Sequence, residues 1–302
     1  MFEKHCNKKE EVFYIEGKTV YNKGERKNER RRSVMLTIEN KSFAEERALY
    51  HLTDAAVVFC RFEGEADGES ALKEGKNLEI NGCFFALRYP LWHVENLKMR
   101  DSRLTESCRA ALWYGRSVLL KSCALDGIKA VRECRGVRLE DCYVHSPEFG
   151  WKSSDIHIEN STIESEYAFL DSRGITAANM DFSGKYSFQY VRNMTVSNSR
   201  LKTKDAFWHT KNVTVKDSLI EGEYLGWYSE NLTLIRCHIK GTQPLCYCKN
   251  LKLIDCTTEE ADLAFEYSGV HADIKGAILS VKNPRRGKIE ADRYGSVILS
   301  DG

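Results

Sequence analysis

The sequence predicts an all-β fold, a single-stranded parallel β-helix of about 12–14 coils with about 19 residues in each coil. Three observations predict it. One pattern returns every 19 residues, apolar and polar residues alternate within each repeat, and no segment keeps a sustained apolar stripe of helical period. Alternation is the side-chain period of a strand. One elongated solenoid therefore accounts for all 302 residues better than two compact domains do.

The repeat is plainest in four segments that each begin with asparagine. They start at Asn193, Asn212, Asn231 and Asn250. In the same register, earlier repeats start at Gly174, Asp155, Gly136, Ser117, Asn96, Asn77 and Asp54, with insertions near residues 63–68 and 105–110. A first coil fits Leu36–Phe43, whereas starts at His271 and Lys288 match more weakly.

These boundaries divide the chain into two parts. Residues 34–302 form the predicted β-helix domain, and residues 1–33 form a charged N-terminal segment to which any helix should be confined. We expect this segment to cap the first coil, because an open end of a β-helix invites edge pairing. Residues 284–287, with Pro284 at their start, interrupt the pattern before a short last coil.

Each repeat assigns its positions to a core, a turn and a ladder. Counted from the first residue as zero, positions +1, +3 and +8 are aliphatic, as in Val213, Val215 and Ile220. Another apolar residue precedes the next start, such as Phe207, so we expect three short strands per coil. Position zero holds Asn, Gly, Asp or Ser, which suits a turn with positive φ. The stacked asparagines should form a hydrogen-bonded ladder.

The eleven cysteines are predicted to be small buried side chains rather than disulfides, and the repeat places most of them inward. Position +6 holds Cys60, Cys83, Cys123, Cys142, Cys237 and Cys256, and serine replaces cysteine in other coils. No CxxC motif occurs, so neither a zinc nor an iron–sulfur site is predicted, and no cofactor is expected. The N-terminus lacks an apolar signal region, which favours a cytoplasmic protein with free thiols. No apolar run is long enough to span a membrane.

An aromatic face is the main candidate for function. All five tryptophans fall four residues before a repeat start, in a column that should face outward. The next column holds histidine, tyrosine and charged residues. We expect a ligand to contact Trp92, His93, Trp113, Tyr114, Arg132, Trp151, Tyr190, Trp208, Trp227, Tyr228 and Tyr247. Two alternatives remain, a buried partner surface and aromatic packing between coils.

Chemistry could occur near the middle of this face. Glu133 and Asp171 lie two coils apart, about 9.6 Å between backbones, near the upper carboxyl separation of inverting glycosidases. Lys152 lies between them and His209 follows two coils later, so these four residues are the candidate catalytic group. An ion-pair ladder from Glu133 through Lys152 to Asp171 explains the same residues without catalysis.

Charge gives weaker information about partners. The chain has 45 basic and 44 acidic residues, so its net charge of +1 gives no general attraction to nucleic acid. A basic column remains a third hypothesis for contact with phosphate or nucleic acid. Its members are Arg116, Arg135, Arg173, Arg192 and Lys211.

The chain also resembles a known superfamily. The strings that show it are Glu46–Tyr50, Gly68–Lys73, Arg88–Trp92, Lys204–Trp208, Glu223–Trp227, Gln243–Cys248 and Asp262–Ser268. They are similar to a bacterial family of unknown function within the right-handed parallel β-helix superfamily of pectate lyases and polygalacturonases. The resemblance implies a right-handed coil. Some members are labelled hydrogenases, but these dispersed cysteines do not form a thiolate cluster.

The resemblance implies a fold rather than an activity. The paired aspartates and Gly-His-Gly of polygalacturonases and the calcium-binding and arginine pattern of pectate lyases are absent. We therefore expect a protein that binds, and as a further hypothesis processes, a carbohydrate or sugar-containing ligand along the aromatic face. The alternative is a non-catalytic structural or interaction module, including a homo-oligomer, that uses the same face.

Overall fold

The computed structural model describes residues 14–15, 18–19, 35–65 and 69–300. The chain divides into two units, Met1–Val34 and Met35–Gly302. In the first unit, β1 (Tyr14–Ile15) pairs antiparallel with β2 (Lys18–Thr19). The expected cap and any helix in this segment otherwise fall outside the described residues.

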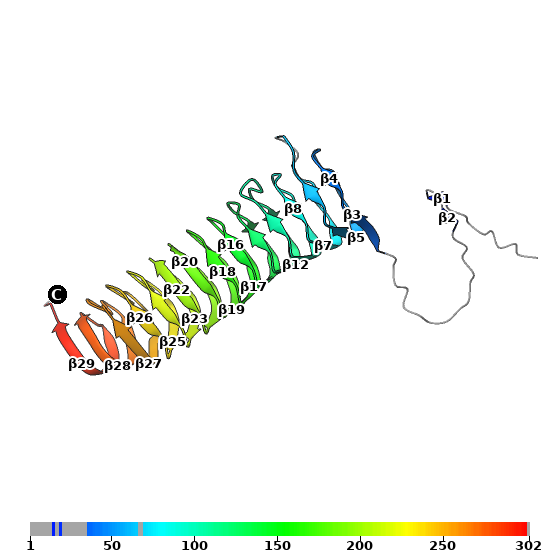
Figure 1. Cartoon of the computed structure of the whole chain (residues 1–302). Helices are drawn as coiled ribbons and strands as arrows, with labels where there is room; N and C mark the ends of the chain where they lie inside the picture. The colour runs from blue at the N-terminus through cyan, green and yellow to red at the C-terminus, as the bar shows by residue number, and fades with distance from the viewer. Residues whose placement is uncertain (1–13, 16–17, 20–34, 66–68, 301–302) are drawn as a thin grey trace, which may run out of the picture. The chain divides into compact units, whose positions relative to one another are not determined.

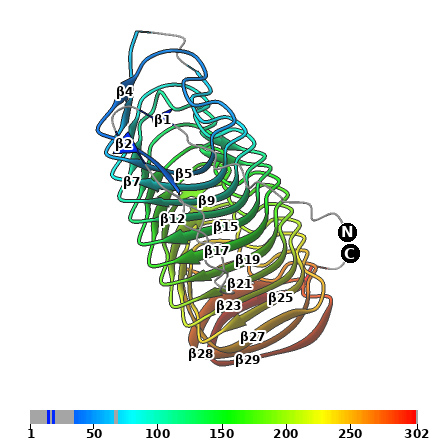
Figure 2. The ribbon, with the colours of Figure 1, turned by 90° about the vertical axis from the view of Figure 1, so that its right-hand side faces the viewer.

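The second unit is a parallel β-solenoid of about 14 coils, which confirms the predicted fold class (Figure 1). Each coil begins with a leading strand, and these strands lie side by side in one sheet (Figure 2). They are β3 (Leu36–Glu39), β5 (Thr53–Val58), β7 (Lys76–Asn81), β9 (Glu95–Arg100), β12 (Arg116–Lys121), β15 (Arg135–Glu140), β17 (Ser154–Glu159), β19 (Arg173–Ala178), β21 (Arg192–Ser197), β23 (Lys211–Lys216), β25 (Glu230–Ile235), β27 (Leu251–Glu259), β28 (Gly269–Lys282) and β29 (Arg286–Ile298).

A second, shorter strand follows most leading strands and forms the second side of the coil. These strands are β4 (Ser42–Phe43), β6 (Arg61–Phe62), β8 (Phe84–Phe85), β10 (Arg103–Leu104), β13 (Ala124–Leu125), β16 (Tyr143–His145), β18 (Thr162–Glu164), β20 (Asp181–Lys185), β22 (Arg200–Lys204), β24 (Leu219–Glu221) and β26 (His238–Lys240). Partners in neighbouring coils are mostly 19 residues apart, as in Val213 with Leu232 and Leu201 with Ile220. None of the described residues lies in a helix.

The third side of each coil differs from the prediction of a third strand. Among the described residues only β11 (Leu112–Trp113) and β14 (Val131–Arg132) form strands there, and the rest of this turn side consists mainly of turns. From Glu148 onward every second residue of this side has a positive φ, as in Asp205 (53°), Phe207 (60°) and His209 (55°). Their amides still bond to adjacent coils, for example His209 N–H to the Trp227 carbonyl at 2.9 Å. Apolar alternation therefore predicted the burial, but could not reveal this backbone conformation.

The core consists of inward rows that run from coil to coil. Val213, Val215 and Ile220 are buried, as their positions in the repeat predict. On the turn side, Phe169, Phe188 and Phe207 stack with ring centroids 5.4 and 5.0 Å apart. One coil cannot bury these residues, because each inward ring is covered by its equivalents in the adjacent coils.

The ten described cysteines are all buried and free. This confirms the inward place predicted for the six at position +6 and for Cys134 and Cys248. At position +6, the Cys237 thiol donates to the Val215 carbonyl at 3.4 Å. Burial raises the pKa of Cys134 to about 12 and that of Cys248 to about 11. These thiols therefore stay protonated near neutral pH and serve as small core residues.

The asparagine ladder is formed in two separate runs. Each Asn amide donates to the amide oxygen in the preceding coil, at 3.0, 2.8 and 2.7 Å from Asn193 through Asn212 and Asn231 to Asn250. A shorter run joins Asp54, Asn77 and Asn96 at 2.8 Å per bond. All position-zero residues in these runs have φ between 50° and 58°, as predicted.

Candidate functional site

One edge of the turn side presents a continuous stack of exposed rings. We call this the aromatic ladder. Its members are Tyr190, His209, Tyr228, Tyr247 and Tyr267. Successive ring centroids lie 5.0, 4.9, 4.8 and 5.8 Å apart, and the first three pairs are within 12° of parallel. The repeat places one ring in each coil, at a spacing of 19 residues as far as Tyr247, so the surface is periodic along the solenoid.

A row of charged residues, most of them cationic, runs beside the aromatic ladder. Two residues after the first four ladder positions, at or just before the start of the leading strands, lie Arg192, Lys211, Glu230 and Lys249, in register with one another. The residue between the two columns is buried in every one of these coils, for example Thr210 between His209 and Lys211. The ladder and the charged row therefore face solvent together.

These two columns enclose a shallow groove. One stretch has a volume of about 380 Å³ and is lined by Tyr190, Arg192, His209, Lys211, Tyr228, Glu230, Tyr247 and Lys249. A second stretch of about 450 Å³ shares Tyr228, Tyr247 and Lys249, and adds Cys248, Tyr267, Gly269, Arg285 and Arg286. The shared residues make the two stretches one groove that crosses several coils.

The rings of the aromatic ladder present polar edges to a ligand, whereas their faces are mostly covered by neighbouring rings. Each inner ring has a neighbouring ring on both sides, so a flat ligand cannot stack between them without separating the coils. Their hydroxyl groups and the His209 imidazole remain at the edge. Burial and the nearby Glu266 carboxylate raise the pKa of Tyr247, whose hydroxyl donates to Glu266 Oε2 at 3.5 Å.

The tryptophan column lies beneath this edge and is only half exposed. The indole N–H groups of Trp92, Trp208 and Trp227 donate to main-chain carbonyls of the next coil at 2.7–2.8 Å. Trp151 donates to the Tyr167 carbonyl in the same way. These indoles tie coils together, so their N–H groups are already occupied. Cys246, which the repeat placed in the same outward column, is fully buried.

The predicted residues nearer the N-terminus form a smaller aromatic cluster. His93 stacks on Tyr114 at 4.9 Å, and Trp92 meets Trp113 edge-on at 5.2 Å. Arg132 lies between two indoles, 5.0 Å from Trp113 and 5.2 Å from Trp151. Its guanidinium also pairs with Glu133 at 3.4 Å and Glu148 at 3.8 Å. Arg132 therefore links Trp113 and Trp151 through cation–π contacts.

Three of the proposed catalytic residues, Glu133, Lys152 and Asp171, occupy the ladder column in successive coils, and His209 lies in that column two coils further on. The amides of Glu133 and Lys152 bond to carbonyls one coil further on. Glu133 pairs with Arg132, and within the described ranges no ion pair joins Lys152 to Glu133 or Asp171. The expected ion-pair ladder is therefore not formed. His209 lies in the aromatic ladder instead, and catalysis by these four residues stays a prediction.

Sequence reasoning missed part of the groove. Lys249, Tyr267, Arg285 and Arg286 line it but were not among the predicted site residues. The position of Lys249 could have been predicted from the repeat, because Lys249 immediately precedes the start at Asn250. The positions of Arg285 and Arg286 could not have been predicted in this way, because both follow Pro284, which interrupts the repeat.

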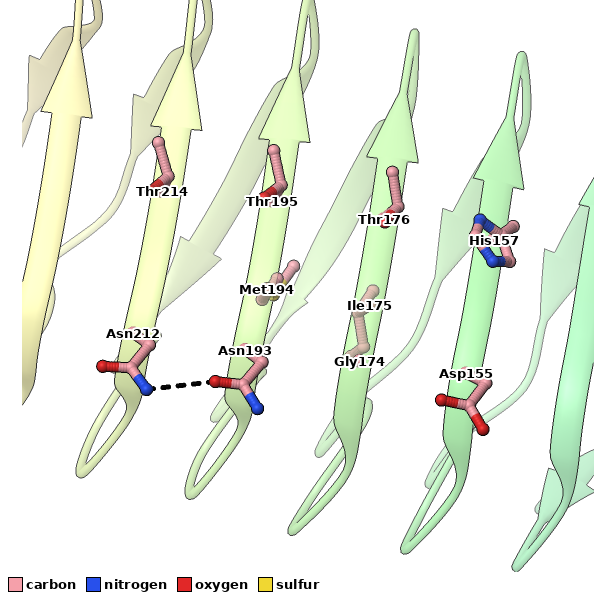
Figure 3. A pocket seen from close by; sticks show the side chains of 10 residues that line it. All are labelled: Asp155, His157, Gly174, Ile175, Thr176, Asn193, Met194, Thr195, Asn212 and Thr214. Atoms are coloured by element: carbon pink, nitrogen blue, oxygen red, sulfur yellow. Dashed lines mark hydrogen bonds between the residues drawn. The ribbon is translucent and has the colours of Figure 1, made fainter.

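A second hollow lies on the outer face of the leading sheet, where β17, β19, β21 and β23 meet (Figure 3). Its volume is about 430 Å³. Thr176, Thr195 and Thr214 form a row across it, and Gly174 leaves a gap between Asp155 and Asn193. This gap is where the asparagine ladder stops, since Asn193 accepts from Asn212 and has no equivalent partner at Gly174.

Gly174→Asn is expected to join the ladder to Asp155 and raise the free energy of unfolding by about 0.5–1.5 kcal/mol. Gly174 has φ of 66°, close to the ladder asparagines, and a Cβ there would lie 3.2 Å from Asp155 Oδ1, the movable end of a side chain. Urea unfolding would measure the change. Gly174→Ala is the control, because it adds a Cβ without an amide. Equal midpoints for the two variants would contradict the missing-rung explanation.

Asp205→Asn tests a buried carboxyl on the turn side. Asp205 is 5% exposed, and burial raises its pKa. The native state then binds the proton more tightly than the unfolded chain, so stability falls as pH rises through the raised pKa. We expect the variant to be more stable at pH 7 by on the order of 1 kcal/mol, with the gain lost near pH 3.

Urea unfolding at both pH values would measure this difference. Asp217→Asn is the control, and it should lower stability at pH 7 rather than raise it. The reason is that Arg236 lowers the pKa of Asp217 through a hydrogen bond. Both aspartates have positive φ, 53° and 50°, so the backbone preference of asparagine is matched. An Asp205→Asn variant that is less stable at pH 7 than at pH 3, relative to the natural chain, would contradict the burial argument.

Comparison with known proteins places the chain in a family. Residues 36–302 match the family described as "Protein of unknown function (DUF3737)". The chain belongs to this family. DUF3737 thus bears out the resemblance to a family of unknown function, while the hydrogenase label and the pectate-lyase-like assignment have no support from it. None of the curated proteins matches the chain.

Several solved structures are similar to this DUF3737 chain. The surface adhesin PfbA of Streptococcus pneumoniae has 9% identity, covers 83% of this chain and 86% of its own, and has a TM-score of 0.42. The tailspike protein of E. coli bacteriophage HK620, in complex with a pentasaccharide, has 10% identity, coverage of 82% and 60%, and a TM-score of 0.43. The A-module of mannuronan C-5 epimerase AlgE4 from Azotobacter vinelandii has 12% identity, coverage of 87% and 87%, and a TM-score of 0.29. These similarities are too weak to say anything about a ligand or an activity.

The described part of the DUF3737 chain has neither a metal-binding cluster nor a membrane-spanning helix. Across residues 14–15, 18–19, 35–65 and 69–300, no three or more His, Cys, Asp or Glu side chains are grouped so as to hold a metal ion. Within the same ranges, no helix has the length and apolar character needed to cross a membrane.

Proposed function

We propose that this protein binds a linear carbohydrate in the groove along the aromatic ladder. The observation that supports it is the periodic groove itself, in which each coil contributes a ring edge and a polar or charged side chain. A ligand made of repeating, hydroxyl-rich units matches a surface whose hydrogen-bonding groups also repeat. The phenol hydroxyls, the imidazole and the cations supply the donors that sugar oxygens accept.

A protein partner fits this groove less well. Interface centres are depleted in charged residues and enriched in well-packed apolar ones. Here a charged side chain lies beside each ring, from Arg192 to Lys249, and these side chains are exposed. Nucleic-acid bases also fit less well, because they need ring faces on which to stack, and neighbouring rings cover most of those faces.

Tyr190→Phe combined with Tyr228→Phe tests the proposal, because phenylalanine keeps the stacked rings and removes two hydroxyl donors. Titration calorimetry against a panel of neutral and acidic oligosaccharides should find a ligand whose affinity falls at least about fivefold in the double variant. Tyr143→Phe is the matched control, since Tyr143 is 47% exposed on β16, outside the groove lining.

Two results would overturn the proposal. One is the absence of binding across the whole panel at millimolar saccharide. The other is a concentration-dependent dimer, measured by sedimentation, that the double tyrosine variant disrupts. The second result would establish the interaction module that the sequence left as the alternative.

A further inference from the structure

We infer that the groove selects an acidic saccharide, one that bears carboxylate or sulfate groups at intervals along its chain. This inference rests on the proposed function and adds the chemical class of the ligand. The carbohydrate ring edges would lie along the aromatic ladder, and the acidic groups would lie over the cations two residues further along each coil.

The charges that line the groove are strongly one-sided. Five cationic side chains line its two stretches, together with a single carboxylate. The cations are Arg192, Lys211, Lys249, Arg285 and Arg286. The carboxylate is Glu230, whose oxygen lies 3.1 Å from Lys211 Nζ. The whole chain has a net charge of only +1, so this excess is a local property of the groove.

Several of these cations are free to meet a ligand. Within residues 35–65 and 69–300, no carboxylate pairs with Arg192, Lys249 or Arg286, and all three are exposed. Glu266, which accepts from the Tyr247 hydroxyl at 3.5 Å, pairs with Lys282 at 2.8 Å, and its side chain is only 14% exposed. The groove therefore offers unneutralised positive charge at both ends and in the middle.

The arrangement of these charges favours a polymer over a small anion. Arg192 and Lys249 lie three coils apart in one in-register row, with Lys211 and Glu230 between them. Arg285 extends the positive charge further and lies over the Tyr267 ring at 5.5 Å from its centroid. A single phosphate or sulfate could reach only one or two of these groups. A chain with acidic groups at intervals reaches several and gains a charge-assisted hydrogen bond at each.

Arg192→Gln combined with Lys249→Gln tests the inference, because both side chains are exposed and neither is needed for an ion pair. The matched control is Arg200→Gln combined with Lys202→Gln, which removes the same two charges from β22, outside the groove lining. The probes are polygalacturonate and chondroitin sulfate fragments, methyl-esterified polygalacturonate and dextran fragments as neutral counterparts, and a single-stranded oligonucleotide. Affinity is measured by calorimetry at two salt concentrations.

We expect an acidic fragment to bind at least about tenfold more tightly than its neutral counterpart, and more weakly at high salt. The groove variant should lose about tenfold or more of that affinity, while the β22 variant keeps it. Equal binding of acidic and neutral fragments would overturn the inference and leave carbohydrate binding intact. An unchanged groove variant, or tighter binding of the oligonucleotide, would also overturn it. Failure of every saccharide would overturn the proposed function itself.

Discussion

Phe188→Ala is expected to lower the free energy of unfolding by about 3–5 kcal/mol. Phe188 is fully buried and lies between Phe169 and Phe207, with ring centroids 5.4 and 5.0 Å away. Removing its ring leaves a cavity in the middle of a stack that spans three coils. The neighbouring rings cannot close that cavity, because each is held in its own coil by the main-chain bonds of the turn side. Urea unfolding would measure the loss.

Phe59→Ala is the matched control for this variant. Phe59 is 60% exposed, and its φ of 50° is close to the 61° of Phe188. The cost of placing alanine in the left-handed region is therefore similar at both sites, and the difference between the variants isolates burial. A loss of less than about 1 kcal/mol in Phe188→Ala relative to Phe59→Ala would contradict the role of the phenylalanine stack.

Gly222→Ala is expected to destabilise the solenoid by about 3 kcal/mol or more. At this corner the main chain of one coil lies directly against the coil before it. A Cβ at Gly222 would collide with the carbonyl group of Thr203, and one at Gly241 would collide with that of Gly222. The obstacle is backbone, so it cannot rotate away as a side chain can. The two coils would have to separate, which would strain the adjacent parallel strands.

Gly276→Ala separates this collision from the cost of a positive φ. Gly276 has φ of 92°, and no atom lies within 4 Å of the place that an alanine methyl group would take, so only the backbone preference is disturbed. We expect a loss of about 1–2 kcal/mol there. Thermal and urea unfolding of both variants would measure the difference. If Gly222→Ala cost no more than Gly276→Ala, contact between coils would not be the reason for glycine at this corner.

The two exposed columns of the groove could each be predicted from the sequence. Tyr190, His209, Tyr228 and Tyr247 were placed in one column because the repeat is 19 residues long, and they do stack in one column. Arg192 and Lys211 were also placed in one column, and they are in register. The sequence could not show that the two columns face the same hollow, because that depends on the turn-side backbone.

The exposure and hydrogen bonds of the tryptophans could not be predicted from the sequence in the same way. Their column was predicted to face outward because it alternates with the buried phenylalanines. The indoles are half exposed, and Trp208 uses its N–H to reach the Tyr224 carbonyl in the next coil. Such a bond joins residues 16 apart, which is not a multiple of the repeat. No pattern of apolar and polar residues identifies that partner.

The amino-acid sequence by itself determined the solenoid, its coil length, its inward rows and its asparagine ladder. Each of these repeats at a fixed interval, and stacking identical positions at a strand spacing requires no knowledge of the rest of the chain. Tertiary structure alone decided which outward side chains are free. Arg132 is held between Trp113 and Trp151, whereas Arg192 is exposed and unpaired within the described ranges. The physical reason is that a side chain's freedom depends on its neighbours in the coils above and below, and those neighbours differ even where the repeat does not.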